Sequence, residues 1–332
     1  MTAPIAIPAE SSSSLTLLVR CADAAPEKWT EWGGHHPAPG VWRFAVQDQP
    51  ALITLLESLH DSLPGSALTE VLAVLTESGG AADVVPLGLL AGLQSLPVLL
   101  ARCRYPWIMG DLSQYVRSYL QPIVDLGRGG QLFAYEALCR GVAPDGSLLN
   151  GEQMFTLAAR ASRLAALDAA CQRSALQTKA RLLPGTGLLF INILPGNLLT
   201  LDLQQEPWLS LPAWGIRPDE LVFEIVESEQ VENLEALVEI SDQLRSRGFR
   251  IALDDVGSGY NGLTALAKLR PDFLKLDRSL VQGVQGSQIR LALLQALISM
   301  AQRLGCAIIA EGLERAEDIA VCCEMGHTKT SR

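Results

Sequence analysis

Carboxylates, an amide and a lysine recur inside short apolar segments of this 332-residue sequence. The segments FAYEAL, FINI, LVFEI, IALDD, FLKLD and AIIAEG carry Glu136, Asn192, Glu224, Asp254 with Asp255, Lys275 and Glu311. Such runs are typical of buried strands, where one lone carboxylate costs several kcal/mol. A single glutamate in a strand is more often a solvent-facing edge residue, but six such runs together argue against that alternative. They require a compensating charge, and a pair of divalent cations would supply it.

The spacing of these segments predicts how they meet. Asn192 and Glu224 are 32 residues apart, and Glu224 and Asp254 are 30 residues apart. Helical patterns such as ENLEALVEISDQLRSRG lie between the segments, so strand and helix alternate as in βα units with a parallel sheet. When such units close into a barrel, the carboxyl ends of the strands converge on one mouth. An open doubly wound sheet is the alternative, but it would not easily bring six strands to one point.

Seven blocks of the sequence resemble the EAL-domain phosphodiesterases, which hydrolyse cyclic di-GMP. The blocks are QPIVDL (121–126), YEALCRG (135–141), FIN (190–192), FEIVE (223–227), LDDVGSGYNGL (253–263), LRPDFLKLD (269–277) and AEGLE (310–314). They follow the family order over about two hundred residues, whereas a lone Glu-Ala-Leu would carry little weight. The resemblance implies an α/β fold, a TIM-type (βα) barrel of the EAL kind at residues 109–332, preceded by a small α/β domain at residues 1–108.

The resemblance also implies a role for each matching residue. Asp255 would help to hold a second metal ion, and Lys275 would lie beside the activated water as general base or electrostatic orienter. Glu227 would support the LDDVGSGY loop and complete the catalytic pair with Lys275. The substrate would contact Gln121, Leu138 and Arg140, with Arg140 on a phosphate. The ligands of the first metal would be Glu136, Asn192, Glu224, Asp254 and Glu311. Hard Mg²⁺ or Mn²⁺ prefers such oxygen ligands.

The function implied by the resemblance is metal-dependent hydrolysis of cyclic di-GMP to the linear dinucleotide pGpG in bacterial second-messenger signalling. A catalytically degenerate EAL-like receptor or protein-interaction module is the alternative, and a non-functional fragment is a third. Single residues also have other interpretations. Lys275 could be an ion-pair partner of Asp254 or Asp277, Arg140 a surface charge, and the glycines of residues 257–262 an ordinary turn.

The sequence departs from the family pattern at three places. Val226 stands where the family often has threonine, and Val256 where it often has phenylalanine; neither change removes a ligand. Gly326 is followed only by HTKTSR, where the family continues into a further strand with a Gln-Gly-Tyr-like segment and a helix. We therefore expect the barrel to lack its last βα unit and to have an open seam with unpaired strands. Turnover would then be slow or absent.

The first part of the sequence predicts a separate small α/β domain with a sensory or regulatory role. Residues 14–20 and 41–48 are expected to be strands, and residues 50–63, 67–78 and 86–103 helices. Residues 105–120 are expected to form a helical connector. His35 and His36 lie in GGHHPAPG, which favours a solvated loop over a metal site. The tryptophans near them, Trp29, Trp32 and Trp42, are expected to pack in a core or loop rather than to form a ligand pocket.

Composition sets the remaining expectations. The net charge of −10 disfavours a binder of polymeric nucleic acid, so metal ions and local arginines must neutralise a nucleotide substrate. Seven cysteines without paired metal spacing indicate reduced thiols in a cytoplasmic protein. MTAPIAIPAESSSS is expected to be a disordered leader, because it lacks the basic start and apolar core of a signal peptide. Residues 84–101 are apolar but contain Pro86 and Pro97, which favours buried helix over a membrane span. A homodimer is compatible with the sequence.

Overall fold

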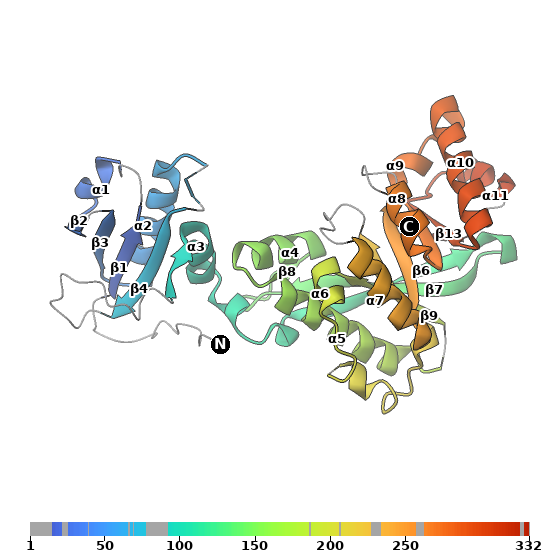
Figure 1. Ribbon diagram of the computed structural model, residues 1–332, viewed down its shortest axis with the longest axis horizontal. Helices are drawn as coiled ribbons and strands as arrows, with labels where there is room; N and C mark the ends of the chain where they lie inside the picture. Colours follow the sequence, from blue (N-terminus) through green and yellow to red (C-terminus); the bar gives the residue numbers. More distant parts are fainter. Residues whose placement is uncertain are drawn as a thin grey trace. The chain divides into compact units, whose positions relative to one another are not determined.

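The computed structural model describes residues 15–21, 26–38, 40–65, 67–68, 70–77, 92–185, 187–205, 207–226, 234–256, 262–325 and 329–331. The chain divides into two compact units (Figure 1). The first comprises Met1–Leu112 with Glu152–Leu164, and the second comprises Ser113–Gly151 with Ala165–Arg332.

The first unit is a mixed layer of helices and one sheet. The sheet order is β2-β3-β1-β4-β5, from β2 (His35–Ala38), β3 (Val41–Val46), β1 (Leu15–Arg20), β4 (Leu72–Glu77) and β5 (Gln94–Ser95). The helices are α1 (Lys28–Glu31), α2 (Gln49–Ser62), α3 (Leu96–Arg104) and α4 (Gly151–Arg160). Asp48 caps α2 by accepting a hydrogen bond from Ala51 N at 2.8 Å, which satisfies an otherwise unpaired donor of the first turn. Leu52, Leu56 and Leu59 of α2 are buried in the core of this unit.

The structure confirms part of the expected N-terminal pattern and corrects the rest. The strands at β1 and β3 and the helix α2 form as expected. The helix expected at residues 67–78 is wrong, because Leu72–Glu77 is strand β4, paired with β1 and β5. His35 and His36 are exposed, as expected, but they lie in strand β2, which pairs with β3, and not in a loop. Trp29 is fully buried against Trp42 and Phe44, as expected for a packing residue. Of the helix expected at residues 86–103, residues 86–91 lie outside the described part, and α3 begins at Leu96.

The second unit is a closed barrel. Within the described residues, eight strands follow the order β6-β14-β13-β12-β11-β10-β9-β7, and pairing of β6 with β7 closes the circle. The strands are β6 (Val116–Asp125), β7 (Gln131–Val142), β9 (Leu188–Ile193), β10 (Leu221–Val226), β11 (Arg250–Val256), β12 (Phe273–Leu276), β13 (Ala307–Glu311) and β14 (Lys329–Ser331). The short β8 (Leu148–Leu149) pairs with β7 outside the circle.

One strand runs against the expected all-parallel arrangement. β6 is antiparallel to both of its neighbours, β7 and β14, whereas the other neighbouring pairs of the circle are parallel. The cause is the short link between β6 and β7, since a parallel pair would need a crossover of a dozen or more residues. Gly129 and Gly130 take positive φ angles of 70° and 77° in that link, a conformation that glycine adopts without steric cost.

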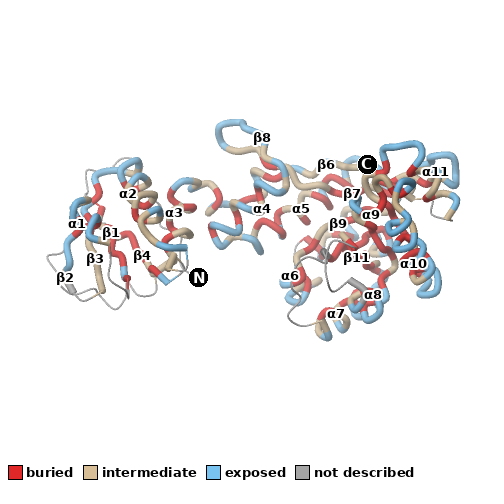
Figure 2. Tube along the Cα trace, turned by 90° about the horizontal axis from the view of Figure 1, so that it is seen from above, coloured by how far each residue is buried: buried red, intermediate tan, exposed pale blue. Residues whose placement is uncertain are grey.

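Helices cover the barrel strands and bury their outward faces. They are α5 (Leu164–Leu182), α6 (Pro195–Leu199), α7 (Leu234–Ser246), α8 (Gly262–Leu269), α9 (Arg278–Val281), α10 (Gln288–Leu304) and α11 (Ala316–Glu324). Strand residues such as Leu189, Phe223 and Leu274 pack in one cluster with helix residues such as Leu176 and Leu266. Figure 2 shows the buried residues concentrated along the strands and the helix faces turned toward them.

The expected open seam is wrong. Lys329 and Ser331 of β14 pair with Ile309 and Glu311 of β13, and the same strand pairs in antiparallel register with residues 123–125 of β6. The buried Thr330 hydroxyl also donates a hydrogen bond to Ala310 O at 2.8 Å. A three-residue strand is therefore enough to occupy the position between β13 and β6.

The connector expected at residues 105–120 is only partly helical. Pro106–Met109 and Leu112–Gln114 form short 3₁₀ turns, and strand β6 begins at Val116. Across the described part of the chain, no helix combines the length and the apolar character that a membrane crossing would require.

Candidate functional site

The inside of the barrel consists of two successive layers of side chains. The lower layer is apolar and contains Ile123, Ala134, Phe190, Val222, Ala252, Phe273 and Ile309. Side chains on one face of a strand recur every second residue, so the next inward position follows two residues later on each parallel strand. Those positions hold Glu136, Asn192, Glu224, Asp254, Lys275 and Glu311, while Gln121 precedes Ile123 by two on the antiparallel β6. We call this second set the charged layer.

Lys275 lies at the centre of the charged layer. It is 1% exposed, and its ammonium group contacts carboxylates from four other strands. Lys275 Nζ lies 2.7 Å from Glu224 Oε1, 2.8 Å from Glu311 Oε1, 3.1 Å from Asp254 Oδ2 and 3.4 Å from Glu136 Oε2. Four carboxylates share one ammonium group, so the cluster keeps an excess of negative charge when all its members are ionised.

The balance of burial and neighbouring charges raises the pKa values of both Lys275 and Glu224 in this cluster. Burial alone would lower the pKa of Lys275, but the attraction of Glu224, Glu136, Asp254 and Glu311 outweighs it and raises the pKa well above its usual range. Loss of solvent raises the pKa of Glu224 well above its ordinary value, and attraction to Lys275 only partly opposes this effect. The carboxylates thus favour the ammonium form of Lys275, and burial favours the neutral form of Glu224.

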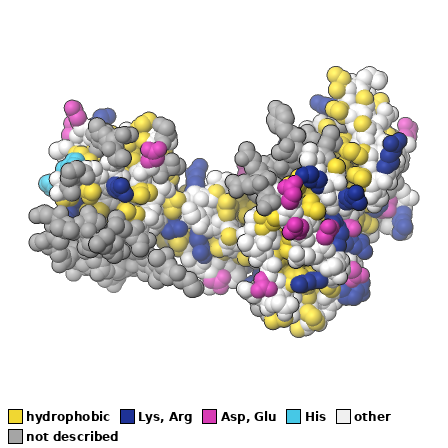
Figure 3. All heavy atoms as spheres, in the orientation of Figure 1, with side chains coloured by type: hydrophobic (Ala, Val, Ile, Leu, Met, Phe, Trp, Pro, Cys, Tyr) yellow, Lys and Arg dark blue, Asp and Glu magenta, His cyan; other side chains and the backbone are white. Residues whose placement is uncertain are grey.

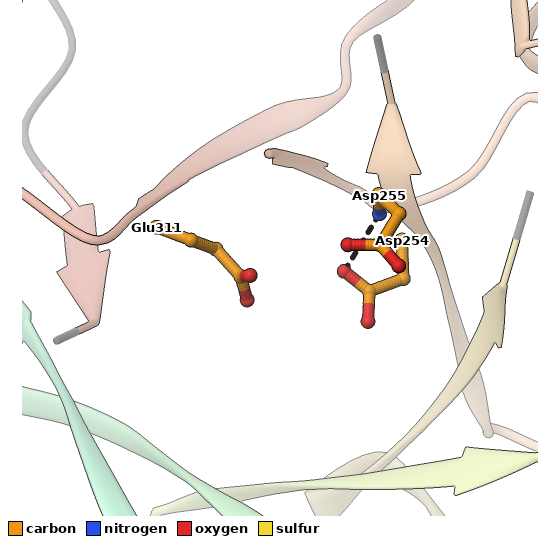
Figure 4. A group of neighbouring side chains, drawn as sticks. All are labelled: Asp254, Asp255 and Glu311. Carbon is orange, nitrogen blue, oxygen red and sulfur yellow. Dashed lines mark hydrogen bonds between the residues drawn. The ribbon is translucent and has the colours of Figure 1, made fainter. Parts of the chain in front are cut away.

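A group of three carboxylates overlaps this cluster, because it shares Asp254 and Glu311 with it and adds Asp255. One oxygen each from Asp254, Asp255 and Glu311 lies within 4.8 Å of the others, and Figure 4 shows the three carboxylates turned toward a common space. Burial raises the pKa of Glu311 to about 7. Burial, followed by repulsion from Asp254, raises the pKa of Asp255 to about 6. Burial is the largest cause of both shifts, so both carboxyl groups favour the neutral form unless a cation lies close to them.

The backbone at the two aspartates is constrained. Asp255 has a φ of 57°, in the left-handed region that non-glycine residues rarely adopt. Asp255 N donates a hydrogen bond of 2.8 Å to Asp254 Oδ1, drawn as the dashed line in Figure 4. This turn lets two consecutive residues direct their carboxylates to the same side, where alternation along a regular strand would separate them.

The donor set fits hard divalent cations. Every carboxylate of the charged layer supplies oxygen, the ligand type that Mg²⁺ and Mn²⁺ prefer. Glu224 is fully buried, and its Oε2 has no hydrogen-bond partner among the described residues. A buried carboxylate oxygen without a donor is costly, and coordination of a cation would remove that cost. The residues present therefore fit a divalent metal site.

The remaining predicted site residues lie on the same strands. Asn192 is in register with Glu224, and Gln121 is in register with Glu136. Leu138 and Arg140 follow Glu136 along β7 at the next two positions of the same face. Arg140 donates a hydrogen bond of 2.7 Å to Cys139 O. Glu227 and residues 257–261 of the predicted loop lie outside the described residues.

Two residues beside the site were not predicted from the sequence. Tyr119 lies on β6, and the guanidinium carbon of Arg140 is 5.7 Å from its ring centroid. Asp168 of α5 is 1% exposed and accepts hydrogen bonds from Asn197 Nδ2 at 2.6 Å and Leu194 N at 3.3 Å. It thereby anchors the segment that follows Asn192. An acidic residue among the apolar positions of LAALDAAC was the available signal for Asp168.

Comparison with known sequences matches most of this unit to one family. The family described as EAL domain matches residues 112–329. The chain is 31% identical over 205 residues to cyclic di-GMP phosphodiesterase NbdA of Pseudomonas aeruginosa, covering 61% of this chain and 26% of that protein. It is 30% identical over 207 residues to probable cyclic di-GMP phosphodiesterase PdeG of Escherichia coli, covering 60% and 40%. The chain thus spans well under two thirds of the length of these relatives.

Solved structures share the fold. A standalone versatile EAL protein from Vibrio cholerae O395, in its c-di-GMP bound form, has a TM-score of 0.56 and 26% identity, covering 65% of this chain and 89% of that chain. Klebsiella pneumoniae BlrP1, in a calcium/cy-diGMP complex, has a TM-score of 0.58 and covers 96% of this chain and 94% of that chain. Its 22% identity shows a common fold alone, which here extends over the N-terminal unit as well.

Proposed function

The chain belongs to the EAL domain family, and from that premise we propose that its barrel hydrolyses cyclic di-GMP to the linear dinucleotide pGpG with the help of divalent metal ions. The observation that carries this proposal is the charged layer. Side chains from successive strands meet at one level of the barrel, and four of their carboxylates surround Lys275 within contact distance.

The carboxylates would serve as the metal ligands. Asp254, Asp255 and Glu311 already have oxygen atoms within 4.8 Å of one another, and Glu224 offers an unpaired buried oxygen. Asn192, in register with Glu224, would add an amide oxygen. Bound Mg²⁺ or Mn²⁺ ions would lower the pKa of a water molecule and stabilise the leaving oxygen of the phosphodiester.

Lys275 would act as an electrostatic orienter rather than as a general base. In the metal-free barrel the surrounding carboxylates outweigh burial and raise its pKa, which favours the ammonium form. An ammonium group can instead donate hydrogen bonds and attract negative charge that develops at the reacting phosphate. This assignment favours one of the two roles that the sequence left open.

Substrate contacts would come from β6 and β7. Arg140 suits a phosphate, because a guanidinium group presents a planar fork of donors that matches phosphate oxygens. The ring of Tyr119 beside it would limit the positions that the guanidinium can take. Gln121 and Leu138 occupy the same face of the β6–β7 pair and would contact the rest of the nucleotide.

The test is a hydrolysis assay on the full chain with Mg²⁺, with Mn²⁺ and with EDTA. We expect turnover with metal and none with EDTA. Glu224→Gln keeps the size of the side chain but removes its charge, and it should lower turnover by about 10²-fold, as expected when reacting groups lose their positions. Glu235→Gln is the matched control, because Glu235 is an exposed residue of α7 paired only at the surface with Lys268. Metal-dependent turnover that is unchanged in Glu224→Gln would contradict the proposed site.

Binding and turnover separate the enzyme from the alternative receptor. Calorimetric titration of cyclic di-GMP in Ca²⁺, beside the same assay in Mn²⁺, would distinguish the two. Tight binding without turnover in Mg²⁺ or Mn²⁺ would favour a receptor or an interaction module. The absence of both would reject the two proposals together.

We further propose that residues 1–108 regulate the barrel of residues 109–332 in the cytoplasm, and that the chain forms homodimers. Deletion of residues 1–108 should change how the turnover rate responds to an input signal, while the dependence of turnover on metal ions stays the same. Sedimentation analysis tests the proposed homodimer. Constitutive turnover identical to that of the full chain would contradict a regulatory role.

A further inference from the structure

The barrel unit has a concave surface that shares no residue with the charged layer. It is a groove with a volume of about 260 Å³ beside helix α5. Its floor is formed by Ala170, Ser174 and Thr178, which recur every four residues along one line of α5. Ala170 and Thr178 are buried, so small side chains at these positions hollow out the helix surface between its longer neighbours.

One wall of the groove is polar and basic. It consists of Arg173, Gln177 and Arg181, again spaced by four residues, on the neighbouring line of α5. The opposite wall comes from Ser113, Val116 and the basic residue Arg117, at and just before the start of β6. Arg117 donates hydrogen bonds to Gln114 O and Val116 O, which fold its guanidinium back along this segment.

The groove concentrates positive charge in an acidic chain. Among the described residues, three arginines and no aspartate or glutamate line it, although the whole chain has a net charge of −10. On the face drawn in Figure 3, by contrast, acidic and basic side chains are interspersed over the barrel unit. Within the described residues, neither Arg173 nor Arg181 forms an ion pair with a carboxylate. A favourable interaction with the dipole of α5 accounts for Arg181, which lies near the carboxyl end of the helix. Arg173 lies in the middle of the helix, where this explanation does not apply.

We propose that this groove binds a small phosphate-bearing anion. Guanidinium groups match phosphate oxygens in paired hydrogen bonds, and the hydroxyl groups of Ser174 and Thr178 add neutral donors at the floor. The volume favours a compact group such as phosphate or pyrophosphate, because sites for larger ligands occupy about 300 to 1,000 Å³. The proposal is independent of the proposed hydrolysis, since none of its residues belongs to the charged layer.

The experiment titrates the metal-free full chain in EDTA with inorganic phosphate and with pyrophosphate. Binding is followed by calorimetry and by melting temperature against sodium chloride of equal ionic strength. Phosphate also stabilises proteins through exclusion from their surface at high concentration, so the titration stays in the low millimolar range. We expect saturable binding and a rise in melting temperature for the unmodified chain.

Two substitutions in the groove test the location. Arg173→Gln and Arg181→Gln should each weaken phosphate binding about tenfold, the loss expected for one charge-assisted hydrogen bond. Arg303→Gln is the matched control, because Arg303 is an exposed residue in the last turn of α10, as Arg181 is in the last turn of α5. Melting curves in chloride establish that all variants fold, since surface substitutions of this kind seldom change stability by more than about 0.5 kcal/mol.

A third substitution separates this groove from the proposed catalytic mouth. Arg140→Gln should remove only phosphate held at the proposed catalytic mouth and should leave the binding that depends on Arg173 and Arg181, because Arg140 does not line the groove. The proposal is overturned if phosphate and pyrophosphate do not bind, if Arg173→Gln and Arg181→Gln bind them as the unmodified chain does, or if only Arg140→Gln loses binding. Binding of a single-stranded oligonucleotide without binding of either small anion would also overturn it, since that result indicates a polymer surface.

Discussion

Two layers inside the same barrel have opposite energetic character. In the lower layer, Phe190 and Phe273 pack with ring centroids 5.0 Å apart, and burial of apolar surface stabilises the fold. In the charged layer, two residues further along the same strands, burial of carboxylates costs free energy unless a cation is present. The strands thus provide identical positions for both layers, and only the residue type decides whether a layer holds the barrel together or requires a ligand.

This difference makes the two layers separable by experiment. A substitution in the apolar layer should cost the same free energy of unfolding with and without metal ions. A substitution in the charged layer should have a cost that depends on metal and on pH. The following four changes test this contrast, from the largest expected effect to the smallest.

Replacing Lys275 with methionine should have the largest effect. It leaves four carboxylates, three of them buried, without their shared ammonium group, and removal of one partner from a buried ion pair typically costs about 3 to 5 kcal/mol. We expect this loss in EDTA at pH 8, measured by urea unfolding, and a smaller loss with Mn²⁺. Turnover should also fall. Lys268→Met, at an exposed pair with Glu235, should stay within about 0.5 kcal/mol. A loss for Lys275→Met that metal does not reduce would break the contrast.

Replacing Phe190 with alanine should cost a similar amount by another mechanism. Phe190 is fully buried in the apolar layer, and such a change typically costs about 3 to 5 kcal/mol through lost burial and the cavity left behind. Because no charge is involved, the cost should be equal in EDTA and in Mn²⁺. Leu132→Ala, at a side chain that is 53% exposed, is the control and should change stability little. A metal-dependent cost for Phe190→Ala would show that the layers are not energetically separate.

The stability of the metal-free protein should depend on pH through Glu311. Its pKa is raised to about 7 in the folded state, so the folded protein binds a proton more tightly than the unfolded chain. The stability that this proton contributes is therefore lost as pH rises toward and through about 7. Glu311→Gln should remove roughly 1 to 2 kcal/mol of that pH dependence, measured as the difference between the two unfolding curves from pH 5 to 8.

Metal ions should act in the opposite direction at the same residue. A cation competes with the proton for Glu311, so Mn²⁺ should raise the melting temperature more at pH 7.5 than at pH 5.5. Equal shifts at both pH values in the unmodified chain would argue against Glu311 as a metal ligand.

Replacing Thr330 with valine should have the smallest effect. The change keeps the shape of the side chain but removes the hydrogen bond to Ala310 O, which is worth about 1 kcal/mol. Because this bond lies in the β13–β14 pair, outside both layers, its cost should not depend on metal. Thr200→Val, at an exposed hydroxyl that bonds within its own turn, is the matched control. A larger loss that disappears with Mn²⁺ would mean that closure of the barrel and the charged layer are coupled.

The sequence predicted the charged layer better than the scaffold around it. Alternation in strands places Glu224 and Asp254 inward by the same rule that places Val222 and Ala252, so a local pattern was sufficient. The central position of Lys275 depends on several strands at once, and the sequence left its role open. Strand β4 was expected to be helical, because its apolar spacing suits either structure and only pairing with β1 decides between them. Strand β14 was missed because three polar residues give no periodic signal.

The closure by β14 has a consequence for how the barrel assembles. Strands β6 and β7 are neighbours in sequence and can pair locally, whereas the pairing of residues 123–125 with residues 329–331 joins distant parts of the chain. Contacts of such long range form slowly, and synthesis supplies the N-terminal strands first. We therefore expect Glu136 and Glu224 to remain hydrated until β12 and β13 bring Lys275 and Glu311. Desolvation of the carboxylates would then fall in the last folding steps, when their counter-charge is already beside them.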